Sequence, residues 1–375
     1  MLKKFKIDIK VLKEMDFTLF IVTILISLFG IINIYEATRM MKGNFTRNQL
    51  IFLLISVVIL YISLHFDYSL LRNYVEIFYW GNIVLLIATK FIGVTVNGAQ
   101  GWIRFPGGYQ FQPAEFMKFA MILMLAKKMD QFDLKVNDFK NFMILVAYCV
   151  LPMGIIMKQP DMGMAMVCFF IALGIFFCAG LDYKIIGGGL IAVLLGIIIL
   201  WNSPLIKDYQ KTRVRALLNQ EADELSTNLQ LTQSMIGIGS GGILGTGPSF
   251  GSDTSRSYVA AFVPESETDF IFAIIAEHWG TIGSTILLIL YGILIYRMIV
   301  DAKEAKDIFG SMICAGFTSY FIFAILQNIG MTIGIMPITG ITLPLVSSGG
   351  SSLVTTFIAI ALILNISMRK KKIYF

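Results

Sequence analysis

The chain has 375 residues, of which 57% are hydrophobic and only 14% are charged. Its mean hydropathy of +0.77 excludes a soluble globular protein. The cysteines Cys149, Cys168, Cys178 and Cys314 lie in apolar stretches without CxxC spacing, so neither a disulfide framework nor a zinc site is predicted. The net charge of +6 comes from lysines and arginines that flank apolar stretches, which favours membrane lipids as partners and not nucleic acid.

About ten apolar stretches are long enough to cross a bilayer, which takes roughly 20 residues as a helix. We therefore predict an all-α polytopic membrane protein with a single membrane domain over residues 1–375. The predicted spans are 17–35, 48–64, 74–91, 113–126, 141–157, 162–181, 185–201, 270–296, 310–328 and 349–368. A large loop, 202–269, separates spans 7 and 8. The first stretch superficially resembles a secretory signal, but its length and the lack of a small-residue cleavage site favour a membrane span.

The distribution of basic residues predicts the orientation. An even number of spans places the tails, 1–16 and 369–375, on one side, and most lysines and arginines outside the spans fall on that side. Short cytoplasmic segments are enriched in these residues. We therefore expect both termini in the cytoplasm, and the 202–269 loop with Asp269 on the outer face of the cell membrane.

A glycine-rich stretch, Gly237 to Gly247, has two possible interpretations. Backbone amides of such turns can bind phosphate, but nucleotide binding needs a strand before and a helix after the loop, which a membrane protein of this kind does not offer. Either the stretch forms tight turns or a re-entrant segment against the spans, or it contacts the pyrophosphate of a substrate.

Several charged residues lie at or inside predicted spans. Glu115 and Lys118 are three residues apart and share one helix face, where they are either a functional cation with its carboxylate or a neutralising pair that fixes packing. Trp102 and Arg104 could bind substrate or form an ordinary interfacial anchor. Asp161 is either a functional carboxylate or a helix cap before Met162.

Asp269 lies where a polar, acidic loop meets a membrane span. It is a candidate general base or cation ligand, and the neighbouring Glu265 and Glu267 would raise its proton affinity by like-charge repulsion. The alternative is that it caps a helix that begins at Phe270, with Thr268 as the rival cap. The uncharged stretch from Asn328 to Ser352 is dense in Gly, Pro, Ser and Thr and is interpreted as a structured loop that closes a cavity.

Several motifs together resemble the SEDS family of bacterial cell-wall proteins (RodA, FtsW and SpoVE). They are, in order, NGAQGWI, FQPAEFMK, KQPDMG, QSMIGIGSGGILGTG, FVPESETDFIFAIIAE and the stretch from NIGM to GGSS, and the last resembles the elongation member RodA more than the division member. The resemblance implies a peptidoglycan glycosyltransferase that polymerises lipid II and works with a class B penicillin-binding protein. It also implies that Asp269 is the catalytic residue and that Glu115 and Lys118 line the cavity beside it. Gln112 and Ser351, which belong to the same motifs, become candidate substrate-binding residues.

In the expected reaction Asp269 takes the proton from the acceptor sugar 4-hydroxyl, which attacks the anomeric carbon of the growing chain and expels undecaprenyl pyrophosphate. Lys118 and Arg104, with Arg213, would offset the charge of the pyrophosphate. A divalent cation, Mg²⁺ or Mn²⁺, held by Asp269 could do the same.

The chain departs from the family pattern at three positions. Glu267 replaces a histidine, Ser348 replaces a tyrosine, and Thr342 stands where proline is usual. Two other functions use the same residues. A lipid II flippase would need Asp269 only for translocation, and a scaffold for the penicillin-binding protein would tolerate neutral substitution of Asp269, Glu115 and Lys118.

Overall fold

The computed structural model describes residues 13–39, 41, 43–96, 99–104, 110–201, 227–247 and 263–370. Every predicted span coincides with a helix, so the predicted fold class is confirmed. The helices are α2 (Phe17–Thr38), α3 (Phe45–Leu64), α4 (Leu71–Ile92), α5 (Pro113–Gln131), α6 (Phe139–Lys158), α7 (Met162–Cys178), α8 (Tyr183–Trp201), α10 (Thr227–Gly241), α11 (Ile271–Glu304), α12 (Ile308–Thr332) and α13 (Gly350–Ser367), with a short 3-10 helix, η2 (Tyr68–Leu70). Seven of the described helices are long and apolar enough to cross a membrane by length and composition.

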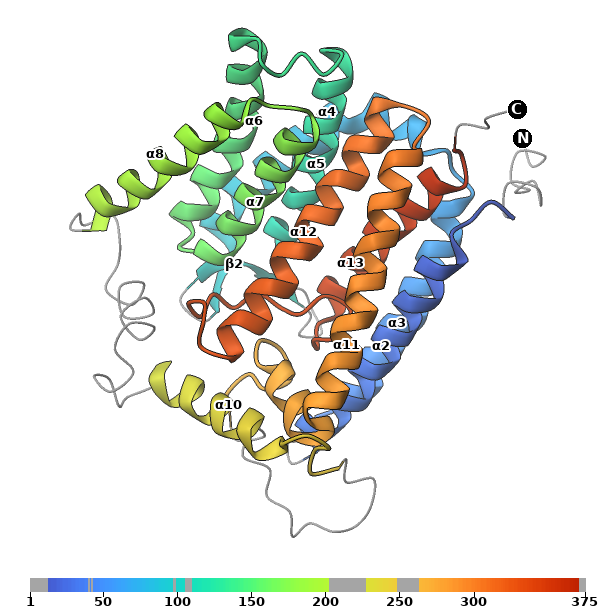
Figure 1. Ribbon diagram of the computed structural model, residues 1–375. Coiled ribbons are helices and arrows are strands. Elements are labelled where there is room, and N and C mark those ends of the chain that lie inside the picture. The colour runs from blue at the N-terminus through green and yellow to red at the C-terminus, as the bar shows by residue number, and fades with distance from the viewer. Residues whose placement is uncertain are drawn as a thin grey trace.

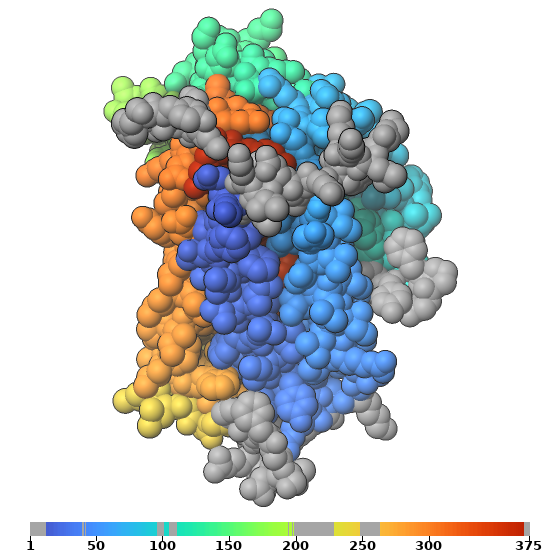
Figure 2. All heavy atoms as spheres, turned by 90° about the vertical axis from the view of Figure 1, so that its right-hand side faces the viewer, coloured from blue at the N-terminus to red at the C-terminus, as the bar shows by residue number. Residues whose placement is uncertain are grey.

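The spans pack as a bundle in which α5 and α12 are the most buried helices (Figure 1). α12 packs against α5, α7 and α11, and α13 packs against α3. Figure 2 shows α2 and α3 side by side on one face, with α11 next to α2. Large apolar side chains are exposed on α2 and α3, among them Leu25, Leu54 and Val58. In a membrane these side chains face lipid.

Several hydroxyl groups inside the bundle donate to carbonyls of the helices that carry them. In α2, Thr23 Oγ1 donates to the carbonyl of Leu19 and Ser27 Oγ donates to that of Thr23, each at 2.8 Å. The helix begins after Asp16, whose carboxylate accepts from the amide of Leu19 at 3.0 Å. Because hydrocarbon offers no hydrogen-bond partner, these local bonds allow polar residues to lie within a span.

The segment 333–349 connects α12 to α13 through the interior of the bundle. Its backbone is held by side chains from three helices: Gln49 of α3, Tyr291 of α11, and Gln327 and Asn328 of α12. Leu343, Leu345 and Val346 are buried. The segment is therefore ordered, as the sequence predicted, because irregular backbone at membrane depth needs protein partners for its amides and carbonyls.

A small antiparallel sheet was not anticipated. It consists of β1 (Val94–Val96), β2 (Ala99–Arg104) and β3 (Gln110–Phe111) in that order, with Val94 opposite Trp102 and Arg104 opposite Gln110. β2 packs against α4 and α5. Trp102 and Arg104, predicted either to bind substrate or to form an interfacial anchor, thus lie on a strand that packs against α5.

α11 is broken at Gly280, where φ is 64° and ψ is −163°. The glycine-rich turn after α10 fills the break. Thr246 and Gly247 donate their amides to the carbonyls of Glu277 and His278 at 2.9 and 3.0 Å. In return, the amides of Thr281 and Ile282 donate to the carbonyls of Gly242 and Ile243 at 2.9 and 3.2 Å. These bonds favour the structural interpretation of the turn over pyrophosphate binding, because they occupy the amides of Thr246 and Gly247.

Candidate active site

Asp269 lies immediately before α11 but does not cap it. The helix begins at Ile271, its N-cap is Phe270, and no side chain caps it. The interpretation of Asp269 as the cap of a helix starting at Phe270 is therefore wrong. Thr268 Oγ1 donates to the carboxylate of Glu265 at 3.0 Å within the preceding loop. The side chain of Asp269 is half-buried.

The backbone around Asp269 is fixed by residues that are distant in sequence. Asn328 Nδ2 donates to the carbonyl of Asp269 and to that of Ile341, both at 2.8 Å. Ser347 Oγ donates to the carbonyl of Thr268 at 2.6 Å. The amide of Ser348 donates to the carbonyl of Glu267 at 2.8 Å. The loop that carries Asp269 is thus bound to α12 and to the segment 333–349.

Gly340 gives the Asp269 carboxylate its place against this segment. Its φ is 72°, a conformation that favours glycine, and a Cβ atom there would lie 3.3 Å from Asp269 Oδ2. A side chain at this position would therefore crowd the carboxylate. The glycine allows the carboxylate to lie directly beside backbone.

Glu115 and Lys118 form a buried ion pair on α5, as their spacing predicted. The distance from Lys118 Nζ to Glu115 Oε2 is 2.7 Å, and the Lys118 side chain is 2% exposed. Lys118 Nζ also lies 4.0 Å from the ring centroid of Tyr320 on α12. Thr355 Oγ1 on α13 donates to Glu115 Oε2 at 3.2 Å. Three helices therefore meet at this pair.

A chain of hydroxyl groups connects this pair to the segment beside Asp269. Thr342 Oγ1 and Ser352 Oγ are 3.2 Å apart. The carbonyl of Ser352 accepts from Thr355 Oγ1 at 3.0 Å, and Thr355 also reaches Glu115. The threonine that replaces a proline in the family pattern thus supplies a hydroxyl to this chain. Ser351 lies one residue away, half-buried in the first turn of α13.

Gln112 and Asp161 contact each other at the start of α5 and α7. Gln112 Nε2 donates to Asp161 Oδ2 at 2.9 Å, and Asp161 Oδ1 accepts from the amide of Met164 at 3.0 Å. Asp161 is therefore the cap of α7, as one of its two interpretations proposed. Trp102 and Arg104 lie nearby on β2, where Arg104 is exposed. Arg213 lies outside the described residues.

Comparison with known proteins identifies the family. Residues 14–372 match the family model of FtsW, RodA and SpoVE, described as cell cycle proteins. The chain belongs to this family. The predicted SEDS resemblance is confirmed.

Relatives in this family carry an enzymatic name. The probable peptidoglycan glycosyltransferase FtsW of Geobacter metallireducens is 30% identical over 98% of both chains. The peptidoglycan glycosyltransferase MrdB of Escherichia coli is 37% identical over 77% of this chain and 76% of its own length. A solved structure on the coordination of polymerization and crosslinking by a peptidoglycan synthase complex contains a chain with a TM-score of 0.82 at 27% identity, covering 96% of this chain and 99% of that one.

This member of the FtsW/RodA/SpoVE family carries an unusual carboxylate at Glu267. The side chain is half-buried, and its Oε2 atom is buried without a hydrogen-bond partner among the described residues. Burial raises the pKa of the Glu267 carboxyl above its usual range, and the nearby Glu265 carboxyl adds to the effect. Glu267 and Ser348, two departures from the family pattern, are direct neighbours through the backbone hydrogen bond described above.

Sequence reasoning did not single out several residues that shape the site. Asn328, Tyr320 and Thr355 contact Asp269, Lys118 and Glu115, respectively, and Ser347 holds the carbonyl of Thr268, yet none of the four is charged. Polar residues inside predicted spans were the available signal for Asn328 and Thr355. Their partners, however, are 59 and 240 residues away along the chain, which no local pattern reveals.

A divalent cation at Asp269 would need ligands beyond the side chains of the described residues. Among the described residues, no group of three or more His, Cys, Asp or Glu side chains could hold a metal ion. Mg²⁺, however, is commonly bound by one or two carboxylates together with phosphate oxygens of a substrate. Asp269 and a pyrophosphate fit that pattern.

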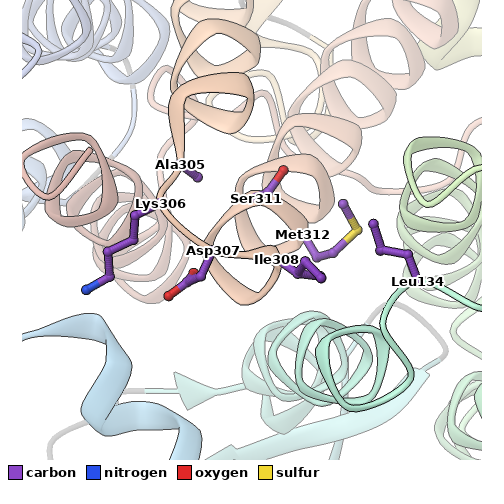
Figure 3. Close-up of a pocket in the computed structure, with 7 residues that line it drawn as sticks. All are labelled: Leu134, Ala305, Lys306, Asp307, Ile308, Ser311 and Met312. Carbon is purple, nitrogen blue, oxygen red and sulfur yellow. The ribbon is translucent and has the colours of Figure 1, made fainter. Parts of the chain in front are cut away.

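A pocket of about 250 Å³ lies at the opposite end of α11 from Asp269 (Figure 3). It is lined by Leu134, Ala305, Lys306, Asp307, Ile308, Ser311 and Met312. Asp307 caps α12 through the amide of Gly310 at 2.8 Å and accepts from Tyr68 Oη at 2.9 Å. These bonds give Asp307 a structural role, and the pocket is not part of the Asp269 site.

Proposed function

We propose that this chain is a peptidoglycan glycosyltransferase that polymerises lipid II at the outer face of the cell membrane. The names of its relatives support the activity. The observation that carries the site assignment is the position of Asp269, whose half-buried carboxylate lies between a polar loop and a membrane span. Such a position suits a substrate with a wet sugar headgroup and a tail in lipid.

Asp269 acts as general base in this proposal. Its carboxylate accepts the proton of the acceptor 4-hydroxyl, the oxygen forms a bond to the anomeric carbon of the growing chain, and the bond to pyrophosphate breaks with its electron pair. The hydrogen bonds from Asn328 and Ser347 to the surrounding backbone keep the carboxylate in place. A positioned base of this kind contributes about 10²–10⁴-fold to a rate.

The cations around the site divide into two kinds. Lys118 is buried and occupied by Glu115 and Tyr320, so in this conformation it organises the interior of the site. Arg104 is exposed on β2 and is the cation better placed to meet a pyrophosphate. A divalent cation shared by Asp269 and the pyrophosphate would supply further positive charge to the leaving group.

We also propose that the partner of this chain is a class B penicillin-binding protein. We further propose that both termini lie in the cytoplasm. The similarity to a chain of a peptidoglycan synthase complex supports the partner. The distribution of basic residues supports the orientation. A role of the protein in cell elongation remains a prediction, based on the RodA-like sequence of residues 328–340.

The test is polymerisation of labelled lipid II by the purified chain, co-expressed with its transpeptidase partner. We expect glycan strands from the wild type and from Glu265→Gln, an exposed carboxylate in the same loop, and none from Asp269→Asn in an intact complex. Chelator followed by Mg²⁺ or Mn²⁺ tests the cation. Strands from Asp269→Asn would refute the base, and lipid II transport across vesicles without strands would favour the flippase.

A further inference from the structure

α10 has an apolar face that nothing in the described structure covers. Leu229 and Ile236 on α10 are 49% and 52% exposed, and Ile243 and Leu244 in the turn that follows the helix are 71% and 79% exposed. The opposite face is buried on the bundle, where Leu231 is 3% exposed and Ser234 Oγ donates to the carbonyl of Thr332 at 2.9 Å. The segment therefore has a fixed orientation with its apolar stripe outward.

The composition and position of this segment indicate what covers the stripe. Residues 227–247 contain no Asp, Glu, Lys or Arg. α10 lies across the end of the bundle, beside the start of α11 (Figure 1). A charge-free helix that presents apolar side chains at the end of a transmembrane bundle matches a helix lying in the membrane interface, although it lacks the basic face of many such helices.

The stripe is continuous with the lipid-facing surface of α11. The amide of Ile282 donates to the carbonyl of Ile243 at 3.2 Å, so α11 and the turn after α10 are adjacent at the end of the stripe. From there, Ile282, Ile286 and Ile289 are 48%, 54% and 57% exposed along α11. Acyl chains that contact α11 would therefore also reach Ile243 and Leu244.

The same turn determines the structure of α11 at its break. Besides the backbone bonds described above, Thr246 Oγ1 donates to the carbonyl of Glu277, and Thr281 Oγ1 donates to that of Gly242, both at 3.0 Å. The half of α11 before Gly280 is short, and it begins two residues after Asp269. Any displacement of the turn therefore moves the helix that follows Asp269.

We propose that α10 and the turn 242–244 form an anchor in the outer leaflet, with acyl chains as the occupant of the apolar stripe. The anchor fixes the depth of the first half of α11 relative to the membrane. It thereby holds Asp269 at the height where the sugar headgroup of a lipid-linked substrate lies. The role of the anchor in positioning Asp269 rests on the proposed function, whereas the contact of the stripe with lipid does not.

Spin labelling tests the lipid contact on the purified chain in liposomes. Cys178, the exposed cysteine, is first replaced in Cys178→Ser, and single labels are placed at Leu244→Cys, at Ile289→Cys as the lipid-facing reference and at Lys135→Cys as the exposed loop reference. We expect the label at 244 to be relaxed by oxygen and protected from a water-soluble nickel chelate, as at 289. If the chelate relaxes the label at 244 as strongly as the label at 135, position 244 faces water and the anchor is refuted. The same result is expected if a protein partner, absent from the purified chain, normally covers the stripe.

Enzymatic activity tests the consequence for Asp269. Ile243→Lys and Leu244→Lys should lower the initial rate of lipid II polymerisation by about tenfold or more, because small displacements of a catalytic group are costly. Ile243→Leu and Leu244→Met, which keep the apolar surface, should retain the wild-type rate. Full activity of both lysine variants, with protection from the chelate lost, would overturn the positioning role. An inactive wild type would refute the proposed function and leave the labelling result standing.

Discussion

Asp269 and Glu267 are two residues apart, but their environments differ. Asp269 lies beside Gly340, whereas one Glu267 oxygen is buried without a partner among the described residues. Because burial raises the pKa of Glu267, its neutral form is favoured in the folded protein. Glu267 is therefore suited to hold a proton near the site at a pH where an ordinary glutamate is ionised.

Replacing Glu267 with glutamine should change the pH dependence of stability. When the pKa of a carboxyl is higher in the folded protein than in the unfolded chain, the group is neutral in both states at a pH below its pKa in the unfolded chain, and it does not affect stability there. As the pH rises through its pKa in the folded protein, the group lowers the free energy of unfolding. Glu267→Gln should thus unfold at the same temperature as wild type at low pH and at a higher temperature near neutrality. Thermal unfolding in detergent across a pH series measures this difference.

A second variant separates the two causes of the raised pKa. Glu265→Gln removes the neighbouring charge but leaves Glu267 buried, and burial is the larger cause. This variant should retain most of the pH dependence of the wild type. A difference between Glu267→Gln and wild type that does not vary with pH would contradict the argument.

The Glu115–Lys118 pair allows structural and functional roles to be separated. Either Lys118→Met or Glu115→Gln leaves one charge buried without its partner, which costs about 3–5 kcal/mol. The double variant Glu115→Gln with Lys118→Met leaves no uncompensated charge and should recover much of that loss. Thermal unfolding midpoints of the four proteins measure the coupling between the two residues.

Activity of the double variant then decides between the two interpretations of the pair. A stable double variant that does not polymerise lipid II would show that the charges are needed for the reaction. A stable and active one would reduce the pair to a packing role. Single variants as stable as wild type would contradict the burial argument itself.

At the scale of elements, the break in α11 predicts opposite effects for two glycines of one stretch. Gly245 has a φ of 81°, and a Cβ atom there would collide with the backbone of His278 and Gly280. Gly245→Ala should therefore cost at least about 2 kcal/mol. Gly239 lies within α10 with no atom within 4 Å of its Cβ position, so Gly239→Ala should be neutral or stabilise by up to about 1 kcal/mol.

Thermal unfolding with intrinsic fluorescence compares these two variants under identical conditions. Trp279 lies next to the break, and its Nε1 donates to Asn33 Oδ1 of α2 at 3.0 Å, so its emission reports on local loosening. Equal stability of the two variants would show that the turn does not support the break.

The elements that the sequence could predict are those with a local cause. Long apolar stretches require helices in a membrane, so the spans followed directly from hydropathy. The break at Gly280 could not be predicted, since isolated glycines are common within membrane helices. The strands β1 to β3 contain two to six residues and carry no alternating pattern strong enough to detect.

The candidate site shows the same division between local and distant causes. The ion pair on α5 and the cap of α7 follow from spacing within one helix. The hydrogen bond from Asn328 to Asp269 and the chain from Thr342 to Glu115 depend on tertiary packing. The motif resemblance, not periodicity, placed Asp269 and the Asn328–Ser352 stretch in one site.

At the scale of the whole molecule, ion pairs connect the first and the last described segments of the chain to the same end of the bundle. Arg297 lies 2.6 Å from Asp16, and Lys370 lies 2.5 Å from Glu304. Arg369 is 3.3 Å from Asp67 in the connection between α3 and α4. Asp269 lies before the start of α11, whereas Arg297 and Glu304 lie near its other end. The described chain ends and the candidate site therefore lie at opposite ends of α11.

This geometry makes the orientation testable at two positions, one before the start of α11 and one after the end of α13. Because basic segments remain in the cytoplasm, Thr268→Cys in the Cys178→Ser background should react with a membrane-impermeant maleimide in intact bacterial cells. Lys370→Cys should react only after the membrane is permeabilised. Labelling of Lys370→Cys in intact cells, with Thr268→Cys protected, would show the opposite orientation to the one proposed. Asp269 would then face the cytoplasm, and polymerisation of lipid II at the outer face would be excluded.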